Sequence, residues 1–164
     1  MPLIVRVPGI AAAPLGARRL SAYAQAADLM PTILELAGAP DPGTIHGRSL
    51  LPVLRGEQAG VRDVCVSTTS LAQRIDPGSA VSHAIPGGLR SMIQVPGWAM
   101  LYGPAAEPQL FDMAADPGQT ANLWPARYDR ARDLWRGYVE WLRSVGTPEQ
   151  FLQPIATDAR FAPG

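Results

Sequence analysis

The sequence predicts a mixed architecture: a partial α/β layer in residues 1–58, a small antiparallel α+β subdomain in residues 59–146, and an extended tail in residues 147–164. Three observations support it. A β-branched run precedes a helix that is apolar almost all round. Four strand-like runs then follow residue 60, and one long amphipathic helix closes the second part. With 47% hydrophobic and only 17% charged residues, the chain has the composition of a folded protein and not of a disordered one.

The first part contains one strand-like run and two helical segments. Residues 3–7 form a compact β-branched run that Pro-Gly ends, which predicts a short buried strand. Residues 28–38 predict a helix with Asp28 as N-cap, and Ser49 introduces a short helix over residues 50–54. Because the helix at 28–38 is apolar on most of its circumference, we expect it to be deeply packed. A single five-residue strand cannot cover such a helix, so this part is expected to belong to a larger layer.

The second part reads as a meander of short strands followed by a helix. The four predicted strands are residues 61–69, 89–95, 98–102 and 109–112, and residues 76–88 are expected to form a long loop. Pro96 and Gly97 favour a hairpin turn between two of these strands. Aromatic and aliphatic residues then recur at spacings of three and four from Tyr128 to Val145, which predicts an amphipathic helix over 125–145. We therefore expect a four-stranded antiparallel sheet packed on a C-terminal helix.

The charge balance excludes several classes of function. The chain has 14 basic residues, all arginine, and 14 acidic ones, so it lacks the basic surplus of a nucleic-acid binder. The longest apolar runs are far shorter than the roughly 20 residues of a membrane span. The first residues lack the charged and apolar regions of a signal peptide, which favours a cytoplasmic protein. Because lysine is absent, any positive group in a site must be arginine, histidine or a backbone N–H.

Cys65 is the only cysteine, so no intramolecular disulfide can form. It lies in an apolar strand-like run with no base beside it, which favours a buried thiol over a nucleophile. Two carboxylates near the fourth strand, Asp112 and Asp116, are expected to stabilise turns. His83, in a loop rich in glycine, proline and serine, and Arg90, at the start of a strand, are the two candidates for a substrate rim. An idle loop histidine and a structural ion pair are the alternatives for these two residues.

Three stretches resemble the sulfatase family of the alkaline phosphatase-like superfamily. They are D-L-M-P-T-I-L-E-L-A-G at 28–38, H-G-R-S-L-L-P-V-L-R-G at 46–56, and L-F-D-M-A-A-D-P-G-Q-T-A-N-L at 110–123, and P-L-I-V-R-V-P-G at 2–9 precedes them as a fourth match. Their order and spacing match over residues 1–145. The chain departs from the family pattern at Gln119, where glutamate is usual, and at Ala99, where lysine is usual.

The resemblance implies an alkaline phosphatase-like α/β layer and a parent enzyme about three times as long. In that family the nucleophile is a formylglycine made within C/S-x-P-x-R, and acidic residues with a D-N or D-H pair bind a divalent metal, usually calcium. This chain contains neither motif, since Cys65 is followed by Val-Ser-Thr-Thr. We therefore assign it no catalytic residue, no metal ligand and no cofactor, and expect calcium or another divalent metal only in a full-length parent.

Two hypotheses remain at this point. In the first, the chain is the C-terminal part of a hydrolase of small sulfate esters, or of phosphonate or phosphate esters, and is inactive alone. Its partner is then the missing N-terminal catalytic portion or another subunit. In the second, the chain is a non-catalytic structural or interaction module, or a split-enzyme subunit. A tail that reaches a neighbouring copy would make it a homo-oligomer, whereas a frayed end would not.

Overall fold

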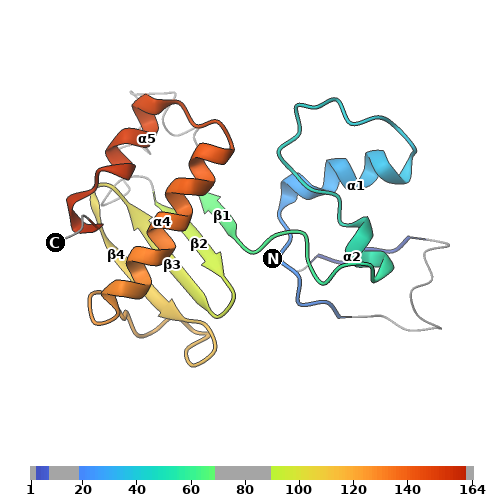
Figure 1. Ribbon diagram of the computed structural model, residues 1–164. Coiled ribbons are helices and arrows are strands. Elements are labelled where there is room, and N and C mark those ends of the chain that lie inside the picture. The colour runs from blue at the N-terminus through green and yellow to red at the C-terminus, as the bar shows by residue number, and fades with distance from the viewer. Residues whose placement is uncertain (1–2, 8–18, 69–89, 162–164) are drawn as a thin grey trace, which may run out of the picture. The chain divides into compact units, whose positions relative to one another are not determined.

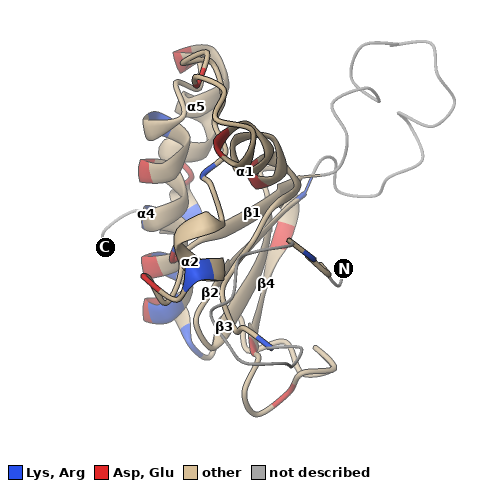
Figure 2. Cartoon of the chain, turned by 90° about the vertical axis from the view of Figure 1, so that its right-hand side faces the viewer, with Lys and Arg blue, Asp and Glu red and all other residues tan. Residues whose placement is uncertain are grey.

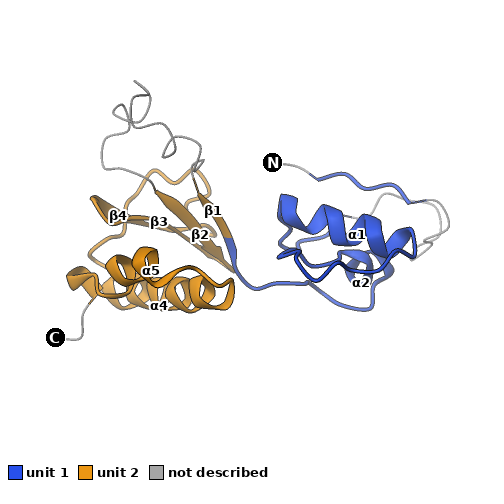
Figure 3. Cartoon of the chain, turned by 90° about the horizontal axis from the view of Figure 1, so that it is seen from above, with its two compact units in different colours: residues 1–65 blue, residues 66–164 orange. Residues whose placement is uncertain are grey.

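The computed structural model of the chain describes residues 3–7, 19–68 and 90–161 (Figure 1). Contacts divide the chain into two units, residues 1–65 and 66–164 (Figure 3). The division falls after Cys65, whereas the sequence places it after residue 58. Residues 59–65 stay with the first unit because the side chain of Arg62 pairs with Asp28 there.

The first unit is built from three short helical segments: η1 (Ala26–Asp28), α1 (Leu29–Leu36) and α2 (Leu51–Arg55). The two helices predicted over residues 28–38 and 50–54 are therefore present. Thr32 joins them, because its hydroxyl donates to the carbonyl of Asp28 at 2.5 Å and accepts from the N–H of Leu50 at 2.9 Å. On the outside, Arg55 lies 3.5 Å from Glu35, so α2 also contacts α1 through an exposed ion pair.

Two expectations for this unit are wrong. Residues 3–7 are not a strand, because no described segment pairs with their backbone, and Leu3, Ile4 and Val5 are exposed. Helix α1 is not deeply packed, since Met30 and Ile33 are each more than half exposed. Both errors have one physical cause: the pattern encodes burial against a layer that the described residues of the chain do not supply.

The second unit contains a four-stranded sheet in the order β1-β2-β3-β4. Its strands are β1 (Cys65–Thr68), β2 (Ser91–Val95), β3 (Trp98–Gly103) and β4 (Ala106–Asp112). β2 and β3 pair antiparallel, as do β3 and β4. Gly97 has φ +78° in the tight turn between β2 and β3, a conformation that glycine adopts without strain. The predicted hairpin and the predicted four-stranded sheet are thus confirmed.

Helix α4 (Tyr128–Ser144) packs along one face of this sheet, against β2 and β3 (Figure 1). The side chains that it buries are Ala131, Leu134, Trp135, Tyr138, Val139 and Leu142. On its outer side, basic and acidic residues alternate, so the helix presents a mixed surface rather than a basic stripe (Figure 2). Pro125, expected as the first residue of the helix, lies instead in the preceding turn, where its carbonyl accepts from the N–H of Tyr128 at 3.0 Å.

Residues 147–164, expected as an extended tail, contain helix α5 (Glu149–Ala156) and the turn η2 (Ala159–Phe161). Only 1% of Phe161 is exposed, and its ring stacks on that of Trp135 with centroids 5.1 Å apart. An eight-residue helix that contains Pro154 shows no clear period in sequence, so its order comes from the burial of Leu152 and Phe161.

Candidate functional site

Of the two residues proposed for a substrate rim, the structure describes only Arg90. His83 lies outside the described residues. Arg90 directly precedes β2 and is half-buried, and its Nε atom has no hydrogen-bond partner among the described residues. A role for either residue at a substrate rim stays a prediction.

The carboxylate of Asp28 is the most deeply buried charge of the described chain, with no exposed surface. Its Oδ2 accepts from the backbone N–H of Gln25 at 2.8 Å. Its Oδ1 accepts from the backbone N–H of Arg48 at 2.8 Å and forms an ion pair with Arg62. Asp28 occupies the N-cap position of α1, as expected, but its carboxylate makes no cap bond to that helix, so this part of the expectation is wrong. The side chain instead turns back to Gln25 and across to segments far along the chain.

Arg62 and Arg48, which bind Asp28, also donate hydrogen bonds to other groups. Arg62 also donates from Nη1 to the side-chain oxygen of Gln25 at 2.8 Å, and Arg48 donates to the carbonyl of Val61 at 2.7 Å. The side chain of Arg62 is only 9% exposed. Because the charge of Asp28 is neutralised and both of its oxygens are occupied, this carboxylate is not available as a general base or as a metal ligand.

The same network explains the glycine of H-G-R-S-L. A Cβ on Gly47 would lie 1.9 Å from the carbonyl oxygen of Ala27, which no side chain tolerates. Residues 47–48 therefore run directly against residues 27–28, and the backbone N–H of Arg48 donates to the carboxylate of Asp28. Two stretches that carry the sulfatase resemblance, 28–32 and 46–50, thus bind each other.

Cys65 lies near this network without being activated by it. Burial raises the pKa of its thiol; Arg62 opposes that change and Asp28 adds to it. A raised pKa keeps sulfur in the unreactive thiol form at neutral pH. The structure therefore favours the interpretation of Cys65 as a structural thiol at the start of β1.

Asp112 and Asp116 stabilise turns, as predicted. The Oδ1 of Asp112 accepts from the backbone N–H groups of Ala114 and Ala115, both at 3.0 Å. Asp116 accepts from the N–H groups of Thr120 and Ala121 at 2.7 and 2.8 Å. These bonds, that from Ala121 first, lower the pKa of the exposed Asp116.

Asn122 closes the same stretch. Its Oδ1 accepts from the backbone N–H of Leu110 and from that of Trp124, both at 3.0 Å, which fastens the loop to β4. Gln119, one of the departures from the family pattern, adopts φ +55° inside the loop. The third family-like stretch, 110–123, therefore shapes a loop after β4.

A second ionic cluster, which is partly buried, was not predicted from the sequence. The hydroxyl of Tyr102 donates to Asp158 at 2.8 Å, and Arg160 pairs with the same carboxylate. Arg160 also donates to the carbonyls of Gly103 and Ala106, on either side of the β3–β4 turn. We call Tyr102, Asp158, Arg160 and Phe161 the C-terminal clamp. The D-A-R-F sequence at 158–161 carries no periodicity, so no sequence pattern indicated it.

The clamp perturbs the ionisation of its members. Burial alone raises the pKa of Asp158, but hydrogen bonds from Arg160 and Tyr102 outweigh it, and the net pKa is lowered. Burial first, and then the bond to Asp158, raise the pKa of Tyr102. Both groups therefore keep their ordinary charge states at neutral pH, and the clamp is an ion pair with a neutral phenol, without a proton-transfer role.

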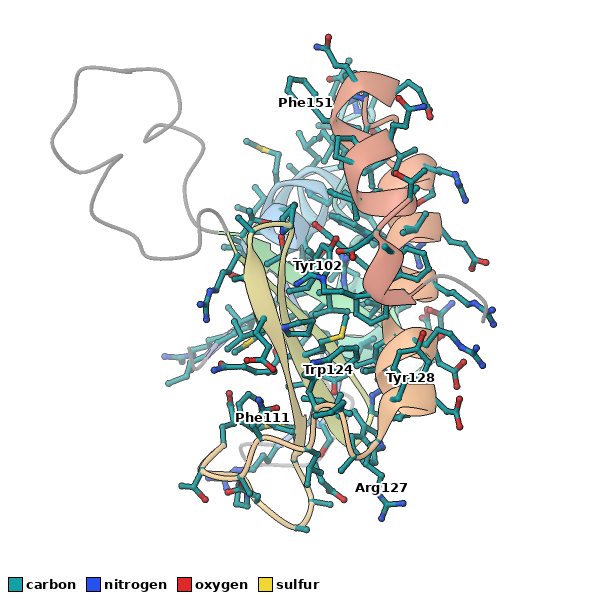
Figure 4. The ribbon with its side chains drawn as sticks, turned by 90° about the vertical axis from the view of Figure 1, so that its left-hand side faces the viewer. Tyr102, Phe111, Trp124, Arg127, Tyr128 and Phe151 are labelled. Carbon is teal, nitrogen blue, oxygen red and sulfur yellow. The ribbon has the colours of Figure 1, made fainter. Side chains whose placement is uncertain are left out.

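Aromatic side chains fill the space between α4 and the sheet. Figure 4 shows Tyr102, Trp124 and Tyr128 directed into this layer, whereas Phe111 lies on the other side of the sheet. Trp135 is buried and donates to the carbonyl of Ile155 at 3.2 Å. Tyr138 is buried too, and its hydroxyl lies 2.9 Å from that of Ser91. These aromatics form a core, which is the interpretation that the sequence favoured over a stacking platform.

Comparison with known proteins shows which proteins this chain is similar to. Steryl-sulfatase of Mus musculus is 33% identical over 126 residues, which cover 65% of this chain and 20% of that protein. The multifunctional alkaline phosphatase superfamily protein PehA of Trinickia caryophylli is 29% identical over 130 residues, which cover 73% of this chain and 24% of that protein. The chain is related to the sulfatases. No family model matches it.

The fold of this sulfatase-related chain is also similar to solved structures of sulfatases and a phosphonate hydrolase. A putative sulfatase from Bacteroides thetaiotaomicron superposes with a TM-score of 0.54 at 22% identity, over 76% of this chain and 25% of that one. Phosphonate monoester hydrolase from Silicibacter pomeroyi superposes with a TM-score of 0.52 at 26% identity, over 82% and 26%. The chain spans only about a fifth to a quarter of the length of its curated relatives.

The described residues of the sulfatase-related chain do not form a set of ligands that fits the divalent metal which the resemblance implies for a parent enzyme. Within the described ranges, no three side chains of His, Cys, Asp or Glu come together as metal ligands. A calcium site needs about six oxygen ligands, several of them carboxylates. The oxygens of Asp28 and Asp116 already accept hydrogen bonds within the fold.

None of the described helices combines the length and apolarity that crossing a membrane requires.

Proposed function

We propose that this chain is the C-terminal part of a sulfatase-like hydrolase and contributes structure, not reacting groups, to its active site. One observation carries the proposal: three of the stretches through which the chain resembles sulfatases bind the chain itself. Asp28 and Gly47 join the first two stretches, and Asn122 fastens the third. Side chains that are fully engaged in this way stabilise a fold and do not attack a substrate.

The reacting groups then come from elsewhere. Hydrolysis of a sulfate ester needs an activated nucleophile, a cation that neutralises developing charge, and an acid for the leaving oxygen. In the proposal, the N-terminal catalytic portion of the same protein, or a separate subunit, supplies the nucleophile and the divalent metal. The thiol of Cys65, whose pKa is raised, is no substitute for that nucleophile.

The substrate in the parent enzyme is a small sulfate ester. A second candidate is a phosphonate or phosphate ester, because the structural likeness to a phosphonate monoester hydrolase reaches 26% identity. The assembled enzyme distinguishes the two. An aryl sulfatase hydrolyses 4-nitrophenyl sulfate faster than 4-nitrophenyl phenylphosphonate, and a phosphonate hydrolase shows the reverse order.

A non-catalytic interaction module is the alternative to a part of a hydrolase. The coding sequence directly upstream separates the two, whether it is in frame with this chain or separate from it. A C/S-x-P-x-R motif with a D-N or D-H pair in that sequence supports the hydrolase, and its absence supports the module.

The purified chain tests the proposal directly. The 164 residues are incubated with 4-nitrophenyl sulfate and millimolar Ca²⁺, and 4-nitrophenol release is followed by absorbance. The expected result is the rate of the buffer alone. Release that scales with the concentration of the chain, and that persists through a second purification step, overturns the proposal.

A further inference from the structure

The side chain of Phe161 fills an aromatic pocket in the second unit. Its ring lies against four others, with centroids between 5.1 and 6.5 Å away; these belong to Tyr102, Trp124, Tyr128 and Trp135. Figure 4 shows the first three of them directed into the layer between α4 and the sheet. The walls of the pocket thus come from β3, from the turn before α4 and from α4 itself, whereas the ring that fills it comes from η2.

A polar site for the guanidinium of Arg160 adjoins this pocket. Nη2 donates to the carbonyls of Gly103 and Pro104 at 3.1 and 3.2 Å, and Nη1 donates to the carbonyl of Ala106. The central carbon of the guanidinium lies 5.6 Å from the ring centroid of Tyr102, in cation–π range. Several carbonyls around one turn match the planar, forked donors of arginine better than the compact ammonium of lysine.

Residues 148–161, all of which the structure describes, have few buried contacts besides these. Apart from Phe161, the one buried residue among them is Leu152. The carbonyl of Ile155 accepts from the indole N–H of Trp135 at 3.2 Å. Segments with few buried contacts open more readily than the rest of a fold. We therefore expect residues 148–161 to undock as one piece while the sheet and α4 stay folded.

We propose that the aromatic pocket and the β3–β4 turn form a binding site for an Arg-Phe dipeptide, and that the segment 148–161 is its ligand within the chain. We call this the Arg-Phe site. When the segment undocks, the site accepts a separate peptide that carries the same dipeptide. This inference concerns the second unit and does not depend on the proposed function.

The chemistry of the site determines what kind of ligand it takes. The pocket encloses one flat ring, and the neighbouring carbonyls accept hydrogen bonds but supply no donor of their own. An anionic or a purely aliphatic ligand would leave those carbonyls or the ring faces without partners. A buried aromatic anchor beside an arginine is also the combination that dominates the affinity of many protein–protein contacts.

A cleavable form of the full chain tests the inference. A protease site is inserted between Thr147 and Pro148, in the connection between α4 and α5, and the purified chain is cut there. We expect the cut chain to keep its circular dichroism spectrum and its two parts to elute together. A fluorescent peptide of residues 148–161 should then replace the resident segment, as followed by fluorescence anisotropy.

Variant peptides show which side chains the site recognises. Phe161→Ala removes the aromatic anchor and should weaken competition at least 100-fold. Arg160→Lys keeps the charge but loses the fork that reaches several carbonyls, so we expect a loss of about ten-fold. The matched control is Gln153→Ala, at an exposed position of α5, which should compete within about two-fold of the unchanged peptide.

Hydrogen exchange of the uncut chain gives an independent measurement. If the segment opens separately, the amides of α5 should exchange at least ten-fold faster than those of β3. Equal exchange of the two elements would overturn the inference, because the segment would then open only with the whole unit.

Two results of the cleavage experiment would also overturn it. Loss of the spectrum on cutting would show that residues 148–161 are an integral part of the core and not a ligand. Equal competition by the unchanged, Phe161→Ala and Arg160→Lys peptides would show that the site does not recognise the dipeptide.

Discussion

Arg62 forms an ion pair with Asp28, 34 positions earlier in the chain, and both side chains are buried. The pair fixes the segment after α2 against the start of α1. Residues 59–65 belong to the first unit, in which this pair lies. Asp28, which lies within a family-like stretch, thus stabilises the fold by joining distant segments of the first unit.

Replacing the charge of Asp28 should unfold the first unit selectively. Asp28→Asn leaves the guanidinium of Arg62 buried without a counter-ion, which costs about 3–5 kcal/mol of unfolding free energy. Hydrogen exchange of the amides in α1 and α2 measures this loss. Tryptophan fluorescence does not, because Trp98, Trp124, Trp135 and Trp141 all belong to the second unit.

The control for this change is Asp129→Asn. Asp129 lies 3.4 Å from Arg132 but is 89% exposed, so its loss should cost less than about 0.5 kcal/mol. Equal effects of the two substitutions would show that the buried pair does not stabilise the first unit.

A methyl group at Gly47 should be as damaging as the loss of the ion pair. The new Cβ of Gly47→Ala would overlap the carbonyl oxygen of Ala27, so the backbone of residues 47–48 must move and Arg48 loses its bond to Asp28. We expect faster exchange throughout α1 and α2. In Gly137→Ala nothing lies within 4 Å of the new Cβ, and alanine favours the helix, so α4 should gain about 0.5–1 kcal/mol.

Truncation of Phe161 should destabilise the second unit. Phe161→Ala removes a buried ring that contacts Trp135, Trp124 and Tyr102, and such truncations cost about 3–5 kcal/mol. Urea unfolding followed by tryptophan fluorescence reports this loss. Phe151→Ala, at a half-exposed position on α5, is the matched truncation and should cost less than about 1 kcal/mol. If Phe161→Ala leaves the unfolding free energy unchanged, Phe161 does not stabilise the second unit, and residues 147–164 are a loose tail.

The C-terminal clamp should make the second unit sensitive to acid. The folded-state pKa of Asp158 is lowered, so its stabilising effect is complete above the ordinary value of about 3.9 and is lost as the pH falls through the folded-state value. Asp158→Asn should therefore be less stable than the parent at pH 7, and the gap should close below about pH 4. Urea midpoints measured between pH 3 and pH 7 test this. A gap that is constant over that range would contradict the ionic role of Asp158.

The sheet and α4 could be predicted because their patterns are local. Apolar and polar residues alternate over residues 89–102, with Pro96 and Gly97 between the two strands. Aromatic residues recur at helical spacing from Tyr128 onward. Each of these patterns lies within a short stretch of sequence and predicts one element. The helices of the first unit could be predicted too, but their packing could not, since the bonds of Asp28 run to Arg48 and Arg62, 20 and 34 positions away. Sequence chemistry alone suggested a local N-cap.

The remaining differences concern burial and not periodicity. The apolar runs at residues 3–7 and in α1 predict burial. In this chain, Ile4 and Ile33 are exposed instead. At the other end, η2 is ordered by Phe161 and the contacts of Arg160 with the β3–β4 turn. Such order depends on tertiary contacts, which a short sequence without a period does not reveal.

The most direct test of the account is sulfate release from 4-nitrophenyl sulfate by this chain and the upstream-encoded polypeptide, assayed separately and together with Ca²⁺. We expect turnover by the assembled pair and none by the 164 residues alone. Turnover by the chain alone, in proportion to its concentration, would contradict it.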